Sequence, residues 1–349
     1  MALMVFLKEI ERCKSNCLSN DLESFFSRGW LEHNIFLEVK RRKAHPLFWI
    51  LVDEIKSKEL ADNLKQIPQP HLNRLIVKLK DGSDEFNLHA TLTEVQVLPY
   101  YFAKSSKNYI VSHEDLIPAT GKKPDIQIQT KSEKYYGEIL TIFQDETDIK
   151  LDNIQEDIRE KIDELTNNPF VVSFGLELNF EKDYIGDFLK FSENLIISNP
   201  KLKEKYNFKA NGQKLAYVMF SESKKGKGFT GFMNGPARMG DDSGRIKNKL
   251  LDKTEQLPPK SKNFIVINLS YMIGGQPDFE NVFFGQLAVN INKETHEAKP
   301  VNLPNSILNH SKGKRISAFI VYKGDYKKRQ IYLNLSSENP INKNELNNI

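Results

Sequence analysis

Two carboxylates thirteen positions apart form the most informative pattern in this sequence. Asp125 follows a proline in the run Pro124–Ile128, and Glu138 lies in the apolar run Tyr135–Leu140. Both runs alternate or stay apolar as buried strands do, and the polar segment Lys131–Lys134 between them predicts a β-hairpin. A hairpin of this length brings Asp125 and Glu138 close enough to share one divalent cation. The pattern therefore predicts a metal site built from oxygen ligands.

A third carboxylate is expected from the helix that precedes the hairpin. A helix beginning at Ser83-Asp84 and running to about Leu98 is predicted by a capping residue and by one apolar face. Glu94 falls at the edge of that face, which must dock on the sheet. Because Mg²⁺ is usually held by one or two carboxylates together with substrate phosphates, we expect Asp125, Glu138 and Glu94 to bind Mg²⁺ or Mn²⁺.

The order of these residues resembles the PD-(D/E)XK nuclease superfamily, over about residues 83–143 and 245–269. In that superfamily a helix carries an acid, and the following strands carry Pro-Asp and Glu-x-Lys. The resemblance implies a restriction-endonuclease-like α/β fold, with a mixed central sheet flanked by helices. It also implies metal-dependent cleavage of DNA phosphodiester bonds in restriction or phage defence, with RNA not excluded as a substrate. Glu94, Asp125 and Glu138 match the helix acid, the motif aspartate and the motif glutamate.

The chain departs from the superfamily pattern at Leu140, where the motif lysine would stand. The resemblance implies that the cation comes from another position in such members. The segment Arg245–Leu257 predicts a helix on which basic and amide side chains lie beside the apolar face. We therefore expect Lys253, or its neighbour Lys249, to replace the motif lysine. The expected catalytic set is Asp125, Glu138, Glu94, Lys253, Lys249 and Gln256.

Each of these residues also has a purely structural interpretation, which stays open at this point. Asp125 is typical of a turn that enters a strand, Glu138 of an edge strand facing water, and Glu94 of a solvated helix face. Two other functions stay open with them. One is a nuclease fold that has lost hydrolysis and binds nucleic acid or assembles with other subunits. The other is a protein-binding scaffold.

Composition excludes several broad classes of protein. With 349 residues, 39% hydrophobic and 28% charged, the chain is typical of a globular protein and not of a disordered one. Its apolar runs are shorter than the roughly 20 residues of a membrane helix, so we expect no membrane association and a cytoplasmic location. The net charge of +4 does not by itself indicate a polyanionic partner. The assembly expected from the superfamily resemblance is a homodimer or a subunit of a defence complex.

The expected organisation is a helical N-terminal region at 1–80, a nuclease-like α/β domain at 81–336 and a polar tail at 337–349. The α/β domain is expected to contain an inserted segment at about 151–243. The basic, glycine-containing run Lys224–Phe229 suits a loop that contacts a nucleic-acid backbone, or a plain mobile loop. The seven histidines show no metal-ligand spacing, and none is assigned a catalytic role. The strands expected in the α/β domain are 108–112, 125–130, 135–143, 170–180, 214–220, 264–269, 317–322 and 330–335.

Overall fold

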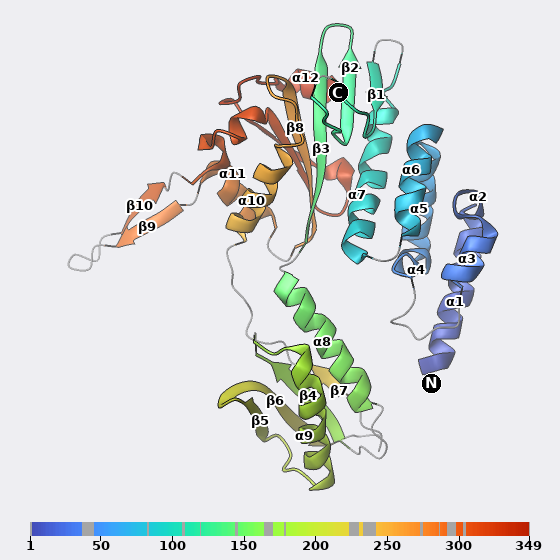
Figure 1. Ribbon diagram of the computed structural model, residues 1–349, viewed down its shortest axis with the longest axis vertical. Coiled ribbons are helices and arrows are strands. Elements are labelled where there is room, and N and C mark those ends of the chain that lie inside the picture. Colours follow the sequence, from blue (N-terminus) through green and yellow to red (C-terminus); the bar gives the residue numbers. More distant parts are fainter. Residues whose placement is uncertain are drawn as a thin grey trace. The chain divides into compact units, whose positions relative to one another are not determined.

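The computed structural model describes most of the chain (Figure 1). The described residues are 2–36, 45–81, 84–106, 109–118, 120–143, 146–163, 170–177, 179–222, 230–232, 242–272, 275–285, 287–291, 298–302 and 305–348. The run Lys224–Phe229 lies outside them. Two compact units are present, and the second is inserted into the first. Unit 1 comprises Met1–Phe143 and Asp241–Ile349, and unit 2 comprises Gln144–Gly240, where the sequence predicted an insertion at about 151–243.

Unit 1 is built on a six-stranded mixed sheet in the order β1-β2-β3-β8-β11-β12. The strands β3, β8 and β11 run parallel to one another, while β1, β2 and β12 are added by antiparallel pairing. An α/β architecture with a mixed sheet is therefore confirmed. The strands are β1 (Tyr109–Ser112), β2 (Ile126–Thr130), β3 (Lys134–Phe143), β8 (Lys262–Tyr271), β11 (Ala318–Tyr322) and β12 (Gln330–Leu333).

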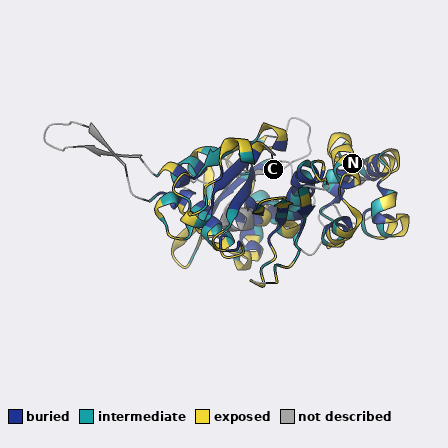
Figure 2. Cartoon of the chain, turned by 90° about the horizontal axis from the view of Figure 1, so that it is seen from above, coloured by how far each residue is buried: buried dark blue, intermediate teal, exposed yellow. Residues whose placement is uncertain are grey.

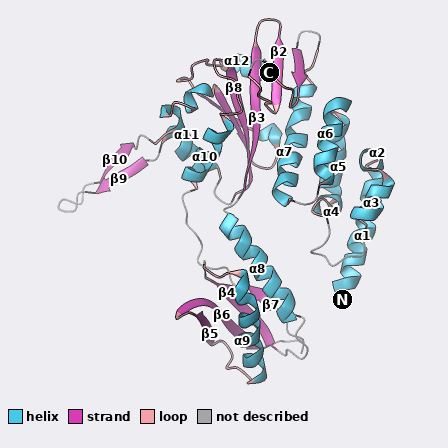
Figure 3. Cartoon of the chain, viewed as in Figure 1, coloured by secondary structure: helices cyan, strands magenta, loops and turns pink. Residues whose placement is uncertain are grey.

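Helices cover both faces of this sheet (Figures 1 and 3). One face packs against α7 (Glu85–Phe102), and the opposite face packs against α10 (Ser243–Lys253) and α11 (Gln276–Phe284). Because side chains alternate along a strand, Ile139 of β3 joins the α7 side and Leu140 the α10 side. The central strands are accordingly buried on both faces, as the dark blue of Figure 2 shows.

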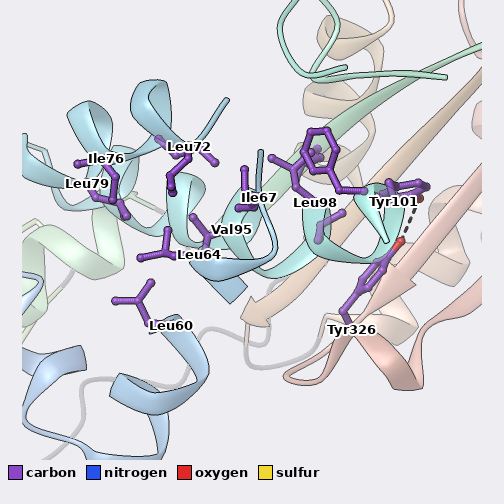
Figure 4. Close-up of a cluster of buried hydrophobic side chains, with 14 of the residues drawn as sticks. Leu60, Leu64, Ile67, Leu72, Ile76, Leu79, Val95, Leu98, Tyr101 and Tyr326 are labelled. Atoms are coloured by element: carbon purple, nitrogen blue, oxygen red, sulfur yellow. Dashed lines mark hydrogen bonds between the residues drawn. The ribbon is translucent and has the colours of Figure 1, made fainter. Parts of the chain in front are cut away.

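The N-terminal helices share one hydrophobic core with α7 and the sheet. Figure 4 shows Leu64 of α5, Leu72 of α6 and Leu98 of α7 within that core. At its far end the hydroxyls of Tyr101 and Tyr326 are 3.0 Å apart and buried. The helical region predicted at 1–80 therefore belongs to the same compact unit as the sheet. Its helices are α1 (Ala2–Ser19), α2 (Glu23–Phe26), α3 (Arg28–Asn34), α4 (Phe48–Leu51), α5 (Glu54–Lys65) and α6 (Gln69–Lys80).

The C-terminal residues, expected to form a polar tail, are packed onto unit 1. They include the short helix α12 (Lys343–Asn348), and Ile341 and Leu346 are buried in the core. Glu345 of this helix forms an ion pair with Lys262 at the start of β8. A separate two-stranded ribbon consists of β9 (Leu287–Ile291) and β10 (Ala298–Asn302). Within the described residues, no helix is long and apolar enough to cross a membrane.

Unit 2 has a four-stranded sheet in the order β5-β6-β4-β7. Its two helices and one face of this sheet form a single hydrophobic core. The connection back into unit 1 is marked by Arg245 of α10, whose guanidinium donates a hydrogen bond to the carbonyl of Phe143 at the end of β3. The elements are α8 (Glu146–Asp163), β4 (Phe170–Leu176), α9 (Ile185–Ile197), β5 (Lys205–Ala210), β6 (Gln213–Glu222) and β7 (Thr230–Phe232).

The central pairing of β3 with β8 depends on a glycine. A Cβ atom at Gly137 would lie 2.5 Å from ring atoms of Phe264, and that ring is stacked on Tyr101. We expect Gly137→Ala to lower the free energy of unfolding by about 1–3 kcal/mol, since the core cannot absorb the added methyl group. Urea unfolding measures this change. Gly244→Ala in α10 is the control, because its Cβ meets no atom within 4 Å; equal stability of the two variants would contradict the expectation.

Candidate metal centre

Asp125 lies where the pairing of β2 with β3 stops. The last paired residues are Ile126 and Gly137, so the next stretch of β3 has no β2 backbone beside it. The Asp125 carboxylate takes that place, because its Oδ2 accepts a hydrogen bond from the Ile139 backbone N–H at 2.7 Å. Asp125 is therefore fixed against β3 by its own side chain and is almost completely buried.

Glu138 lies in the middle of β3 and is fully buried. Its neighbours on the same side of the strand, Tyr136 and Leu140, belong to the core beneath α10. Among the described residues, Glu138 Oε1 is buried without a hydrogen-bond partner, although almost every buried polar atom in a protein has one. An edge position facing water is thus excluded for Glu138, and one of its oxygens is left open to an additional ligand.

Lys253, the last residue of α10, contacts both carboxylates. Its Nζ lies 2.8 Å from Glu138 Oε2 and 3.7 Å from Asp125 Oδ2. The same ammonium donates to Gln256 Oε1 at 3.2 Å. Helix α10 ends at Lys253, not at Leu257 as expected, so Gln256 lies in the following turn. Lys249 lies one turn earlier on α10 and is half-buried.

The charges of this cluster balance only if one of its acids is protonated. Two buried carboxylates face one ammonium, so ionising both would leave one negative charge without a counterion among the described residues. Burial, followed by the nearby Asp125 carboxylate, raises the pKa of Glu138 to about 8. Burial also raises the pKa of Asp125, although Lys253 acts against this shift. Burial works against the charge of Lys253, yet the two carboxylates outweigh it and raise the pKa of the ammonium.

Glu94 is close to this cluster but makes its direct contacts elsewhere. Its Oε2 lies 3.1 Å from Lys78 Nζ and 2.9 Å from His113 Nε2. Lys78 also forms an ion pair with Glu114 at 2.7 Å. The charge of Glu94 nevertheless contributes to raising the pKa values of Asp125 and Lys253, so the two groups of residues influence each other.

Glu94, His113 and Glu114 form a compact set of ligand atoms, all within 4.8 Å of one another. As with Lys253, a single ammonium, that of Lys78, faces the two carboxylates of this set. The two sets differ in burial, since Glu94 and Glu114 are partly exposed whereas Glu138 is fully buried. Glu138 also has a buried oxygen without a hydrogen-bond partner among the described residues, so the Asp125–Glu138 pair fits a divalent cation better than this set does.

Sequence reasoning missed Lys78, His113 and Glu114. All seven histidines were set aside for lack of metal-ligand spacing, yet His113 is fully buried against Glu94. One signal was available in the sequence. His113 and Glu114 directly follow β1, which pairs with β2, so they are carried to the same edge of the sheet as Asp125. Lys78 had no comparable signal, because it comes from α6 in the N-terminal region.

Comparisons with protein-family models, with curated proteins and with solved structures find no match for this chain. The assignment of a function consequently depends on the geometry described above.

The raised pKa of Glu138 predicts how stability depends on pH. Without metal, the folded chain keeps a proton on Glu138 that the unfolded chain has released above its ordinary pKa of 4.5. The free energy of unfolding should therefore fall as pH rises from about 4.5 to about 8, by at most about 1.4 kcal/mol per pH unit. Glu138→Gln should make this fall shallower. The raised pKa of Asp125 acts in the same direction, so some slope remains.

Urea unfolding in EDTA, repeated across that pH interval, measures the two slopes. Parallel pH profiles for the wild type and Glu138→Gln would show that Glu138 does not carry the extra proton.

Proposed function

We propose that the chain is a metal-dependent endonuclease that cleaves DNA phosphodiester bonds, with a restriction-endonuclease-like fold. The observation that supports this most is the buried Asp125–Glu138 pair, which has one ammonium for two carboxylates and one oxygen without a partner. The order of the elements agrees with the superfamily pattern. Helix α7 carries Glu94, β2 follows Asp125, β3 carries Glu138, and α10 and β8 follow after the inserted unit 2.

In this proposal Asp125 and Glu138 hold Mg²⁺ or Mn²⁺, and Glu94 acts as a third carboxylate near them. The donor set suits these ions, since both prefer carboxylate oxygens. When bound, such an ion polarises the scissile phosphate and favours the ionised form of a coordinated water. The hydrogen bond from Ile139 N–H holds the Asp125 carboxylate in its orientation, so little reorganisation is required of the protein.

Lys253 takes the part of the motif lysine in this proposal. Leu140, which occupies the motif position, points into the core beneath α10, and Lys253 enters from the end of that helix. Its ammonium reaches the same carboxylates that a lysine at residue 140 would have neighboured. Because its pKa is raised, Lys253 stays protonated at neutral pH and can stabilise negative charge on the phosphate. Gln256 accepts a hydrogen bond from this ammonium and so orients it. Lys249, one turn earlier on α10, is the second candidate for the role of the motif lysine.

The biological setting follows the superfamily resemblance. We propose DNA as the substrate, a cytoplasmic location, and a role in restriction or phage defence, as a homodimer or as a subunit of a larger defence complex.

A second candidate function is a nucleic-acid-binding or assembly module that has lost hydrolysis. It is favoured by Leu140 at the motif position and by the direct ion pair of Lys253 with Glu138. In that case the ammonium is a permanent structural partner of the carboxylates. Salt-sensitive DNA binding without any product in Mg²⁺ or Mn²⁺ would support this function over the first.

Asp125→Asn tests the metal role with little risk to the fold, because the amide oxygen can still accept the Ile139 hydrogen bond. Mutating residues that only support metal ligands lowers metal affinity or activity about 10–100-fold. We therefore expect loss of this charged ligand to lower the cleavage rate at least about 100-fold. Nicking of supercoiled plasmid DNA in Mg²⁺ or Mn²⁺, with EDTA as the blank, gives the rate. Asp252→Asn, an exposed residue beside Lys253, is the matched control. Full activity of Asp125→Asn would remove the assignment.

Lys253→Met tests the replacement of the motif lysine. Loss of a preorganised positive group near the reacting phosphate is expected to slow cleavage by about 100-fold or more. Adding Leu140→Lys to this variant should recover part of the activity, since residue 140 lies on the same side of β3 as Glu138. Single-turnover cleavage rates compare the three proteins. A fully active Lys253→Met variant would exclude a catalytic part for this ammonium.

A further inference from the structure

Unit 2 presents one face of its sheet without a covering helix among the described residues. Helices α8 and α9 both pack on the other face, together with Val172, Phe208 and Val218. Along β5, the side chains that alternate with Phe208 point to the opposite face, and these residues, Lys205 and Asn207, are exposed. The alternation of buried and exposed residues therefore separates a core face from an open face.

Tyr217 of β6 lies at the centre of the open face. It pairs in register with Asn207 of β5 on one side and with Gly175 of β4 on the other. A Cβ atom at Gly175 would lie 2.6 Å from the Tyr217 ring, so the ring occupies the space above that glycine. The ring thus lies across the neighbouring strand while the residue remains partly exposed. A flat aromatic ring on an open sheet is the arrangement on which nucleobases stack.

Lysines surround this ring. Lys205 Nζ lies 4.6 Å from the centre of the Tyr217 ring, and Lys214 Nζ lies 5.4 Å from it. Lys209, which is exposed, pairs in register with Lys214. Glu177 forms an ion pair with Lys214 at 2.7 Å and offsets one of these charges. The open face, defined as Lys205, Asn207, Lys209, Lys214 and Tyr217, keeps a positive excess beside an aromatic ring.

We infer that this open face binds single-stranded DNA, with one base on the Tyr217 ring and the phosphates along the lysines. Stacking on an aromatic ring requires an unpaired base, which excludes an intact duplex from this surface. The positive excess is complementary to the phosphate backbone. The choice of DNA over RNA rests on the proposed function, whereas the binding surface itself rests only on the geometry of unit 2. This surface belongs to unit 2, whereas the carboxylates belong to unit 1, and its role is binding and not cleavage.

The test measures binding of the full-length protein to fluorescein-labelled oligo(dT) by fluorescence anisotropy, in EDTA so that no cleavage occurs. We expect Tyr217→Ala to weaken binding about tenfold and Tyr217→Phe to retain it, since stacking needs the ring and not the hydroxyl. Lys205→Gln should reduce the dependence of log affinity on log salt concentration by about one unit. Lys190→Gln on the outer side of α9 is the matched control and should change nothing.

Each outcome decides a separate point. Unchanged affinity of both Tyr217→Ala and Lys205→Gln, with unaltered unfolding curves, would overturn the binding surface. If Tyr217→Ala does not fold, the binding surface is tested with Lys205→Glu instead, because Lys205 is exposed and its replacement does not disturb the core. Tighter binding of oligo(U) than oligo(dT) would overturn the assignment to DNA, and preference for a duplex would overturn the stacking arrangement. Because EDTA prevents cleavage, this assay measures binding alone, so a failed nuclease assignment leaves its result unaffected.

Discussion

The rest of the site depends on one constraint, which is that two buried carboxylates share a single ammonium. Asp125 and Glu138 are removed from water and share one ammonium, that of Lys253. A buried charge without a partner is costly, so the protein must keep either a proton or another cation there. The start of β2, the end of α10 and the fully buried position of Glu138 on β3 keep these three groups together.

The second constraint ties the N-terminal helices to this site. Lys78 and Arg74 lie one turn apart on α6, and they contact Glu94, Glu114 and the segment after β1. Lys78 forms ion pairs with Glu94 and Glu114, and the charge of Glu94 acts on Asp125 and Lys253. The N-terminal region is thus an electrostatic part of the centre as well as a packing partner of the sheet. It shares one hydrophobic core and one compact unit with strands that lie far along the chain.

Much of the architecture follows from local patterns in the sequence. The hairpin of β2 and β3 was expected because its apolar residues recur at strand spacing, and Lys253 was chosen because a buried glutamate without its motif lysine needs another cation. The end of α10 was misjudged, because Pro258 was expected to end the helix at Leu257, whereas the helix ends at Lys253 and residues 254–256 form a turn. Strand β5 was missed because three of its six residues are exposed and polar. The pairing of Lys78 and His113 with Glu94 depends on how α6 packs beside β1, which no local pattern reports.

The hydrogen bond from Arg245 to the carbonyl of Phe143 has a consequence for the history of this architecture. It joins the residue where the chain leaves unit 1 to the helix where it returns. An insertion whose two ends meet can be gained, exchanged or lost without disturbing the host sheet. The parallel pairing of β3 with β8 would otherwise demand closure of a very long loop during folding. If unit 2 folds first, it brings the ends of the chain that carry β3 and β8 close together and so shortens the loop that must close.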